Sequence, residues 1–433
     1  MSGKRVGFYT LGCKVSQYET EAIAEEFERR GFVRSPFESP CDVYVVNTCT
    51  VTAESDRKSR QMIRRAHKLN PDAIVMVTGC YAQSAPDALT AIDGVAYVGG
   101  NDEKLKLAAR AEALLAGAPP MCEVVPLDNV PFEPMCITHA PRTRAYVKIE
   151  DGCECRCTYC AIPAARGPVR SKAPADVLRE VRSLVQGGVR EIVLTGIETA
   201  SYGVDLDGFD LLDLLELLDL ESGAERIRLG SMTPEWFHPS RIERLSRLCS
   251  VTPHFHLSMQ SGADAVLRGM RRRYNRTQAE RAVEHLRRAF PRLQLTADFI
   301  VGFPGESDAD FADTLAFAKM AGFLSMHVFA YSARRGTPAA RMKEQIPESV
   351  KHARSEELIA LGAVLHRENL AAVLARGETL SVLMETESDG VYHGHSDSFL
   401  EVLVKSTDEL HGRIVRVRPT SIAGECLLGE IVN

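Results

Sequence analysis

A short run of cysteines limits what this chain can fold into more than any other feature of its sequence. Four thiols lie within eight residues, and Cys153, Cys157 and Cys160 form a C-x3-C-x2-C triplet. Three thiolates at this spacing can hold one cubane of iron and sulfide, which normally takes four cysteine ligands. The triplet therefore predicts a cluster with one iron left free to bind another molecule. Residues 145–149, just before the loop, have the pattern of a strand.

The composition places this loop in a soluble and reducing setting. The chain has 433 residues, enough for about three domains, and its 45% hydrophobic and 25% charged residues are ordinary for a globular protein. No signal-peptide pattern follows Met1, and no apolar run approaches the roughly 18 residues of a membrane span. We therefore expect a cytoplasmic protein without a membrane segment, whose clustered cysteines are metal ligands rather than disulfides.

Residues 1–115 alternate between strand and helix patterns, which predicts a small α/β domain with a parallel sheet. The expected strands are residues 6–10, 42–46, 73–77 and 95–98, and the expected helices are residues 18–30 and 57–68. Cys13, Cys49 and Cys80 follow the first three strands. Ligands of open α/β sheets lie outside the carboxyl ends of the strands, so these thiols favour a second three-thiolate site. The alternative is that each cysteine is a small buried hydrophobic residue.

Residues 143–370 repeat a strand–helix unit and end in a charged helix at 350–369. The expected strands are residues 146–149, 191–194, 226–229, 254–259, 293–301 and 325–331. Six strands rather than eight predict a partial, open-sided (β/α)6 barrel of the TIM-like type, with its functional loops at the carboxyl ends of the strands. The cysteine triplet follows the first strand, as this rule requires.

Turn residues delimit the segments on either side of this barrel. Residues 116–142 are predicted to be a linker, because prolines interrupt any regular element there. The prolines are Pro119, Pro120, Pro126, Pro131, Pro134 and Pro141. Residues 371–433 contain short alternating segments separated by glycines, which predicts a small all-β barrel or sandwich of about five strands.

These motifs together resemble a known family. The triplet, with Tyr159 before its last thiol, looks like the cluster loop of radical S-adenosylmethionine (SAM) enzymes. A cysteine-ended sheet before it and a small β domain behind it, similar to a TRAM module, resemble the methylthiotransferases. TLGCKVSQYET (residues 10–20) and VNTCTVT (residues 46–52) look closest to the branch that acts on threonylcarbamoyladenosine in tRNA. Further matching motifs are residues 195–197, 260–262, 302–306 and 336–341.

The resemblance implies two [4Fe–4S] clusters and S-adenosylmethionine. The cluster on the triplet would bind this cofactor through its open iron and cleave it to a 5′-deoxyadenosyl radical. The radical would take a hydrogen atom from C2 of threonylcarbamoyladenosine next to the anticodon, where a methylthio group would enter. A cluster on Cys13, Cys49 and Cys80 would donate the sulfur, and a second cofactor molecule the methyl group. The implied partners are a tRNA, an electron donor such as flavodoxin or ferredoxin, and a sulfur source.

Six residues at the barrel mouth are expected to contact the cofactor. They are Tyr159, Glu198, Ser258, Gln260, Gly302 and Gly305. Ser258 and Gln260 are placed to contact its ribose or carboxylate, and Glu198 to accept a hydrogen bond from its ammonium group. The turn from Gly302 to Gly305 would let the backbone approach its adenine. The alternative is that these are ordinary loop and cap residues.

RNA binding must use local patches, because a formal net charge of −6 gives no global basic field. Two basic runs stand out, Arg57–Lys68 and the run of Arg271, Arg272 and Arg273, next to which Tyr274 would stack a base. The acidic C-terminal domain would contact RNA through a few residues only, namely Arg413, Arg416 and Arg418. The alternative is that these basic runs are solvent-exposed helix faces with no binding role.

The chain departs from the family pattern at a few positions and leaves rival functions open. Ser16 stands where the family usually has Asn, and Cys155 is an additional thiol that we predict to be a bystander. The segment from Glu198 to Gly203 also differs in detail. The rivals are methylthiolation of an aspartate on a ribosomal protein, methylthiolation of isopentenyladenosine in tRNA, and a non-catalytic zinc or iron–sulfur scaffold for RNA.

Overall fold

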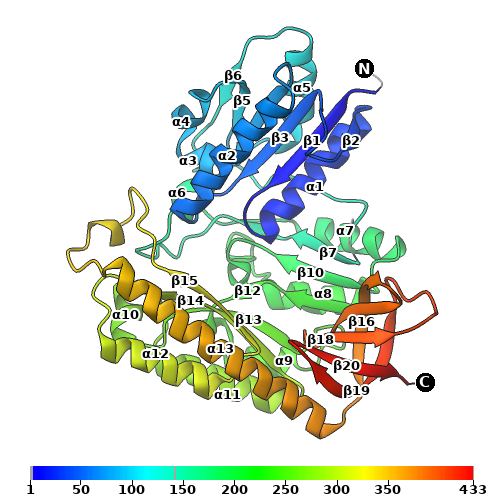
Figure 1. Cartoon of the computed structure of the whole chain (residues 1–433), viewed down its shortest axis with the longest axis vertical. Helices are drawn as coiled ribbons and strands as arrows, with labels where there is room; N and C mark the ends of the chain where they lie inside the picture. Colours follow the sequence, from blue (N-terminus) through cyan, green and yellow to red (C-terminus); the bar gives the residue numbers. More distant parts are fainter. Residues whose placement is uncertain (1–2, 141–142, 433) are drawn as a thin grey trace.

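The structure is a computed structural model that describes residues 3–140 and 143–432, and it has three parts (Figure 1). An N-terminal parallel sheet carries helices on both faces, parallel strands form an open barrel in the middle, and the C-terminal strands form a closed barrel. This architecture confirms the predicted fold class. Pro141, the last proline of the predicted linker, lies outside the described residues.

The N-terminal sheet has six parallel strands in the order β2-β1-β3-β4-β5-β6. They are β1 (Arg5–Thr10), β2 (Val33–Ser35), β3 (Val43–Thr48), β4 (Ile74–Gly79), β5 (Val95–Gly99) and β6 (Met121–Glu123). The helices are α1 (Lys14–Arg29), α2 (Ala53–Leu69), α3 (Cys80–Ser84), α4 (Pro86–Thr90), η1 (Lys104–Lys106) and α5 (Leu107–Leu115). β3 is buried throughout, because α1 and α5 cover one face of the sheet and α2 covers the other.

Strand β6 corrects the prediction that residues 116–142 contain no regular element. Met121, Cys122 and Glu123 pair in parallel with β5 at the edge of the sheet. The prolines on either side do not prevent this, because an edge strand of three residues needs only a few backbone hydrogen bonds on one side.

The central barrel is open-sided and consists of two neighbouring sheets of parallel strands, β11-β10-β7 and β12-β13-β14-β15. The strands are β7 (Arg144–Lys148), β10 (Glu191–Thr195), β11 (Arg226–Leu229), β12 (Ser231–Met232), β13 (His254–Gln260), β14 (Gln294–Val301) and β15 (Ser325–Ala330). The outer helices are α7 (Pro174–Gln186), α8 (Leu211–Glu221), α9 (Pro239–Leu245), α10 (Asp264–Gly269), α11 (Arg276–Ala289) and α12 (Asp308–Ala321). Shorter elements are β8 (Glu150–Asp151), α6 (Ile162–Arg166), β9 (Arg170–Ser171), η2 (Thr199–Ser201), η3 (Pro234–Trp236) and η4 (Ala339–Arg341).

A long helix, α13 (Glu348–Arg376), runs along the barrel beside β15 (Figure 1). Within the described residues it is the one helix whose length and mean hydropathy, 1.4 over 18 residues, would allow it to cross a membrane. Its packing indicates a structural role instead: Leu358 is buried in the main core, and Leu370 and Val373 are buried against the C-terminal barrel.

The C-terminal barrel closes the end of the central barrel where the strands begin. Its strands are β16 (Leu380–Ser388), β17 (Val391–Ser396), β18 (Glu401–Lys405), β19 (Ile414–Ala423) and β20 (Cys426–Ile431). Phe399, in the turn between β17 and β18, stacks on His254 at 4.5 Å between ring centroids and lies 4.9 Å from the Arg228 guanidinium. Its φ of 73° is rare for a bulky residue, so this contact constrains the turn.

Glu191 is the buried centre of this contact. Its carboxylate lies 2.8 Å from Arg228 Nε and 3.4 Å from Arg226 Nη1. Burial alone would raise the pKa of Glu191, but the charge and hydrogen bond of Arg228, followed by the charges of Arg144 and Arg226, lower it to about 2. Arg226 also donates to Ser381 O, so the carboxylate fixes arginines that bind the C-terminal barrel.

We predict that Glu191→Gln lowers the free energy of unfolding by about 3 kcal/mol, because it leaves buried guanidinium groups without their counter-charge. Urea denaturation measures this change. The control is Glu243→Gln, which removes an exposed pair with Arg247 and should cost less than about 1 kcal/mol. Equal stabilities of the two variants would contradict the assigned role of Glu191.

Candidate cluster and cofactor sites

The cysteine triplet lies in a loop directly after β8, and each of its sulfurs accepts a hydrogen bond. Cys153 Sγ accepts from the Cys155 N–H at 3.5 Å, and Cys160 Sγ from the Ile162 N–H at 3.4 Å. Cys157 Sγ accepts from Arg272 Nη1 at 3.4 Å. Hydrogen bonds to the sulfurs are one of the means by which proteins stabilise iron–sulfur clusters. The loop therefore fits a cluster held by three thiolates.

Gly152 explains how the chain enters this loop. Its φ is 90°, and a Cβ there would lie only 1.8 Å from the carbonyl oxygen of Pro168. The adjacent Cys153 N–H then donates to Gly167 O at 3.1 Å. The start of the thiol loop is thus held against the segment that follows it.

The three distant cysteines gather at the carboxyl edge of the N-terminal sheet, as topology predicts. Cys13 is the N-cap residue of α1, which begins at Lys14 rather than at residue 18, and Cys80 is the first residue of α3. Burial raises the pKa of Cys49 to about 11, and the charges of Cys80 and Cys13 contribute in the same direction. Cys49 is therefore within electrostatic reach of the other two thiols, and a metal centre would have to displace its proton.

Cys80 lies in an environment suited to an anionic sulfur. Arg166 Nε donates to Cys80 Sγ at 3.2 Å and Asn101 Nδ2 at 3.6 Å, and all three side chains are buried. Gly79 makes this placement possible, because its φ is 100° and a Cβ there would lie 2.4 Å from Thr48 O. A guanidinium donor suits a thiolate, so the donor set at Cys80 fits a metal ligand.

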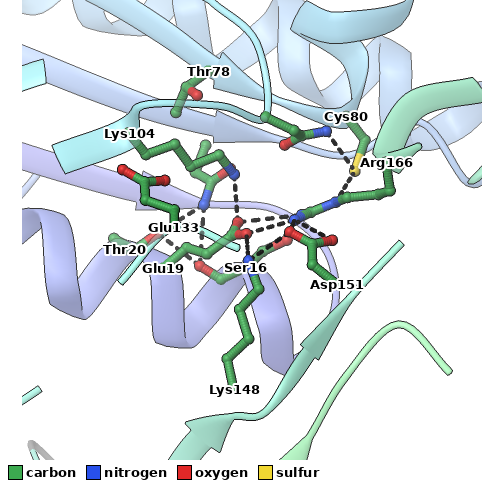
Figure 2. A network of polar contacts seen from close by, with 12 residues as sticks. Ser16, Glu19, Thr20, Thr78, Cys80, Lys104, Glu133, Lys148, Asp151 and Arg166 are labelled. Atoms are coloured by element: carbon green, nitrogen blue, oxygen red, sulfur yellow. Dashed lines mark hydrogen bonds and ion pairs between the residues drawn. The ribbon is translucent and has the colours of Figure 1, made fainter. Parts of the chain in front are cut away.

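A network of buried charges surrounds this contact (Figure 2). Glu19 on α1 accepts hydrogen bonds from Lys104, Lys148 and Arg166, and Lys148 Nζ also lies 2.6 Å from Asp151 Oδ2. Burial would raise the pKa of Glu19, but the charges of Arg166, then Lys104 and Lys148, hold it well below its usual range. The network thus joins the N-terminal sheet to the first strands of the barrel.

Glu198 has the properties expected of a residue that receives a cation. It is buried after β10, and its Oε1 has no hydrogen-bond partner among the described residues. Burial, followed by the charge of Cys155, raises the pKa of Glu198 to about 8. A bound ammonium group would satisfy the orphaned oxygen and favour the charged carboxylate. This site therefore fits the cofactor that a three-thiolate cluster implies.

The other five predicted cofactor residues lie at the same end of the barrel. Gln260 adopts a φ of 65° beside a bulge at the end of β13, a strained backbone of the kind found at ligand sites. The Ser258 carbonyl accepts from Arg272 Nη2 at 3.0 Å. Tyr159 packs on the small core of the loops after β13 and β14. Gly302 approaches Lys351 of α13, and Gly305 is exposed.

The barrel interior holds a polar group that the sequence analysis missed. His256 Nε2 lies 3.1 Å from Asp298 Oδ2, and His327 on β15 pairs in register with Asp298. Lys14 lies within electrostatic reach of both Asp298 and His327. β15 ends its sheet and His327 is exposed, so the group is accessible from solvent. Polar residues at every second position of β13 are the signal that could have revealed it.

The basic run at residues 271–273 divides into two kinds of residue. Arg271 and Arg273 are exposed, whereas Arg272 is half-buried and contacts the cluster loop. The prediction that Tyr274 stacks a base is wrong: the residue is only 4% exposed, and its hydroxyl donates to the Met259 carbonyl at 2.5 Å. Arg413, Arg416 and Arg418 are exposed on β19 or just before it.

A cavity of about 800 Å³ lies between the cysteine triplet and the N-terminal sheet. Cys157 and Cys160 line it from the barrel, and Thr50, next to Cys49, lines it from the N-terminal sheet. Four arginines also line it, namely Arg156, Arg271, Arg334 and Arg335. Asp56 also lines the cavity and pairs with Arg334, so its wall beside Cys157 and Cys160 is mostly positive.

Two family models match segments of this chain, and a solved structure shares its fold. Residues 147–318 match the radical SAM superfamily, and residues 5–100 match an uncharacterized protein family, UPF0004. The fold resembles the radical S-adenosylmethionine methyltransferase TsrM from Kitasatospora setae, with a TM-score of 0.58, 18% identity and coverage of 78% of this chain and 77% of that one. This chain is therefore a radical SAM protein, which implies a [4Fe–4S] cluster and S-adenosylmethionine.

Relatives narrow the class further. The chain is 41% identical to threonylcarbamoyladenosine tRNA methylthiotransferase MtaB from Bacillus subtilis, over 95% of this chain and 93% of that protein. It is 34% identical to tRNA-2-methylthio-N(6)-dimethylallyladenosine synthase from Moorella thermoacetica, over 98% and 97% of the two chains. The chain belongs to the methylthiotransferase family of radical SAM enzymes, as its motifs predicted.

We predict that Cys155→Ala retains the cluster of the triplet. The hydrogen bond to Cys153 Sγ comes from the backbone N–H of residue 155, which alanine also provides. Anaerobic reconstitution followed by iron analysis and measurement of 5′-deoxyadenosine tests this. Cys157→Ala is the matched control and should lose the 5′-deoxyadenosine signal together with the iron of one cluster. Loss of the cluster from the Cys155 variant would show that the C-x3-C-x2-C assignment is wrong.

Proposed function

We propose that this enzyme adds a methylthio group to C2 of N6-threonylcarbamoyladenosine next to the anticodon of tRNA, giving 2-methylthio-N6-threonylcarbamoyladenosine. The cavity is the observation that carries the proposal, because it is lined by Cys157 and Cys160 and extends to Thr50, the residue that follows Cys49. Similarity to the Bacillus subtilis enzyme over 95% of the chain supports the choice of substrate.

The six cysteines are assigned to two [4Fe–4S] clusters. When bound, the cluster on Cys153, Cys157 and Cys160 supplies the electron that cleaves S-adenosylmethionine, and the cluster on the other set supplies sulfur. That other set is Cys13, Cys49 and Cys80. Glu198 accepts from the ammonium group of the cofactor, and Gln260 and Ser258 hold its polar groups at the end of β13. Tyr159, Gly302 and Gly305 border this space.

The charged interior of the barrel suits the substituent of the proposed substrate. A threonylcarbamoyl group carries a carboxylate, a hydroxyl and ureido N–H groups, whereas a dimethylallyl group is apolar. Lys14 and His327 are placed to bind the carboxylate, and Asp298 to accept from the hydroxyl or an N–H. An apolar group there would desolvate the Lys14 ammonium without offering it a hydrogen bond, which costs free energy.

The exposed arginines give the tRNA a discontinuous basic path. Arg271 and Arg273 lie near the cavity, and Arg413 and Arg416 lie on the C-terminal barrel at the other end of the central strands. A tRNA bound at both places would extend along the molecule. Turnover also requires a cytoplasmic electron donor such as flavodoxin or ferredoxin, and a source of sulfur.

Nucleoside mass spectrometry of tRNA from a strain lacking this protein tests the proposal. We predict that 2-methylthio-N6-threonylcarbamoyladenosine disappears, that N6-threonylcarbamoyladenosine accumulates, and that the intact gene restores the product. Persistence of the product would refute the proposed substrate. Loss of the methylthio derivative of dimethylallyladenosine alone would identify the other family activity instead.

The same strain tests the role of Lys14. Complementation with Lys14→Met should lower the ratio of product to precursor, because a charged hydrogen bond is worth about ten- to a hundredfold in binding. Lys319→Met on the exposed face of α12 is the control and should match the intact protein. A Lys14 variant with full activity would exclude this residue from substrate recognition.

A further inference from the structure

Arg166 is the residue that connects the two cysteine regions. It ends α6, six residues after Cys160, and its side chain is 0% exposed. Its Nε donates to Cys80 Sγ at 3.2 Å, its Nη1 lies 3.2 Å from Asp151 Oδ2, and its Nη2 lies 3.2 Å from Glu19 Oε2 (Figure 2). One guanidinium therefore uses three of its nitrogens on three different partners.

Each of these three partners is a proposed cluster ligand or lies on a segment that carries one. Cys80 is itself a ligand of the N-terminal set, and Glu19 lies on the helix whose N-cap is Cys13. Asp151 accepts from the Gly152 N–H at 2.8 Å, just before Cys153. A displacement of Arg166 would therefore reach both thiol groups.

The network contains more positive than negative charge. Two buried carboxylates, Glu19 and Asp151, face four buried cations. The cations are Lys104, Lys148, Arg166 and Arg170. Glu133 lies at the rim, where it accepts from the Leu105 N–H and burial raises its pKa. Such a surplus is costly in a protein interior unless an anion completes it, and a thiolate-bound cluster at Cys80 supplies that negative charge.

We propose that Arg166 is a positioning residue that raises the reduction potential of the cluster bound by Cys80 while holding that cluster against the radical-generating loop. The inference rests on the proposed function, because it requires a cluster on Cys13, Cys49 and Cys80. Reduction adds negative charge to a cluster. A cationic donor on a ligand sulfur therefore stabilises the reduced form more than the oxidised form, and the potential rises.

A protein with only the N-terminal cluster isolates the effect. The parent is the full chain with Cys153→Ala, Cys157→Ala and Cys160→Ala, reconstituted anaerobically with iron and sulfide. Its midpoint potential is read by redox titration with electron paramagnetic resonance. Three further variants are made in this parent. Arg166→Gln removes the charge, and Arg166→Lys keeps the charge without the guanidinium group. Arg170→Gln is the control. Arg170 contacts Asp151 at 3.5 Å in the same network.

We expect Arg166→Gln to shift the midpoint potential to a more negative value. The equilibrium constant for reduction should fall by a factor of about ten to a hundred. Each factor of ten corresponds to about 59 mV for a one-electron step. Arg166→Lys should shift the midpoint less, and Arg170→Gln should shift it least, because Arg170 contacts Asp151 rather than Cys80. The lysine variant keeps the test decisive if the glutamine variant fails to fold.

Other outcomes would overturn the proposal in distinguishable ways. If every variant had the midpoint of the parent, Arg166 would have a structural role only. A positive shift would contradict the electrostatic argument. A parent protein that binds no iron would overturn the two-cluster function together with this inference, whereas unchanged midpoints with a full iron content would overturn the inference alone.

Discussion

A buried carboxylate, Glu19, fixes the geometry on which the rest of the molecule depends. It has no contact with solvent, and its partners Lys104, Lys148 and Arg166 come from three segments of the chain. Removing the Glu19 carboxylate would leave these buried cations without their counter-charge, at a cost of several kcal/mol. The N-terminal sheet and the central barrel therefore have one favoured arrangement, and the two cysteine regions inherit it.

This arrangement assigns different tasks to the two ends of the central barrel. The cysteine loop, Glu198 and Gln260 lie where the strands end, beneath the N-terminal sheet. The C-terminal barrel is held where the strands begin, through Glu191 and Phe399. A tRNA that contacts both ends must extend along the barrel, so the net negative charge of the chain does not exclude RNA binding through separate basic sites.

Sequence reasoning succeeded where a local pattern determines the structure. The spacing of Cys153, Cys157 and Cys160 indicates a candidate site by itself, and the alternation of strands and helices brings three strand-end cysteines to one edge. It failed where the partner is distant in the chain. Arg166 and Cys80 are 86 residues apart, and no local pattern indicates that they meet. The run at residues 271–273 was read as one basic surface, but packing buries Tyr274 and directs Arg272 to Cys157.

The iron content of the protein tests directly whether two separate cysteine sets each hold a cluster. After anaerobic reconstitution the intact chain should hold about eight iron atoms. Alanine at Cys153, Cys157 and Cys160, or at Cys13, Cys49 and Cys80, should each leave about four. An intact chain with about four iron atoms, all lost with one set and none with the other, would show that a single cluster is present and contradict the two-site arrangement.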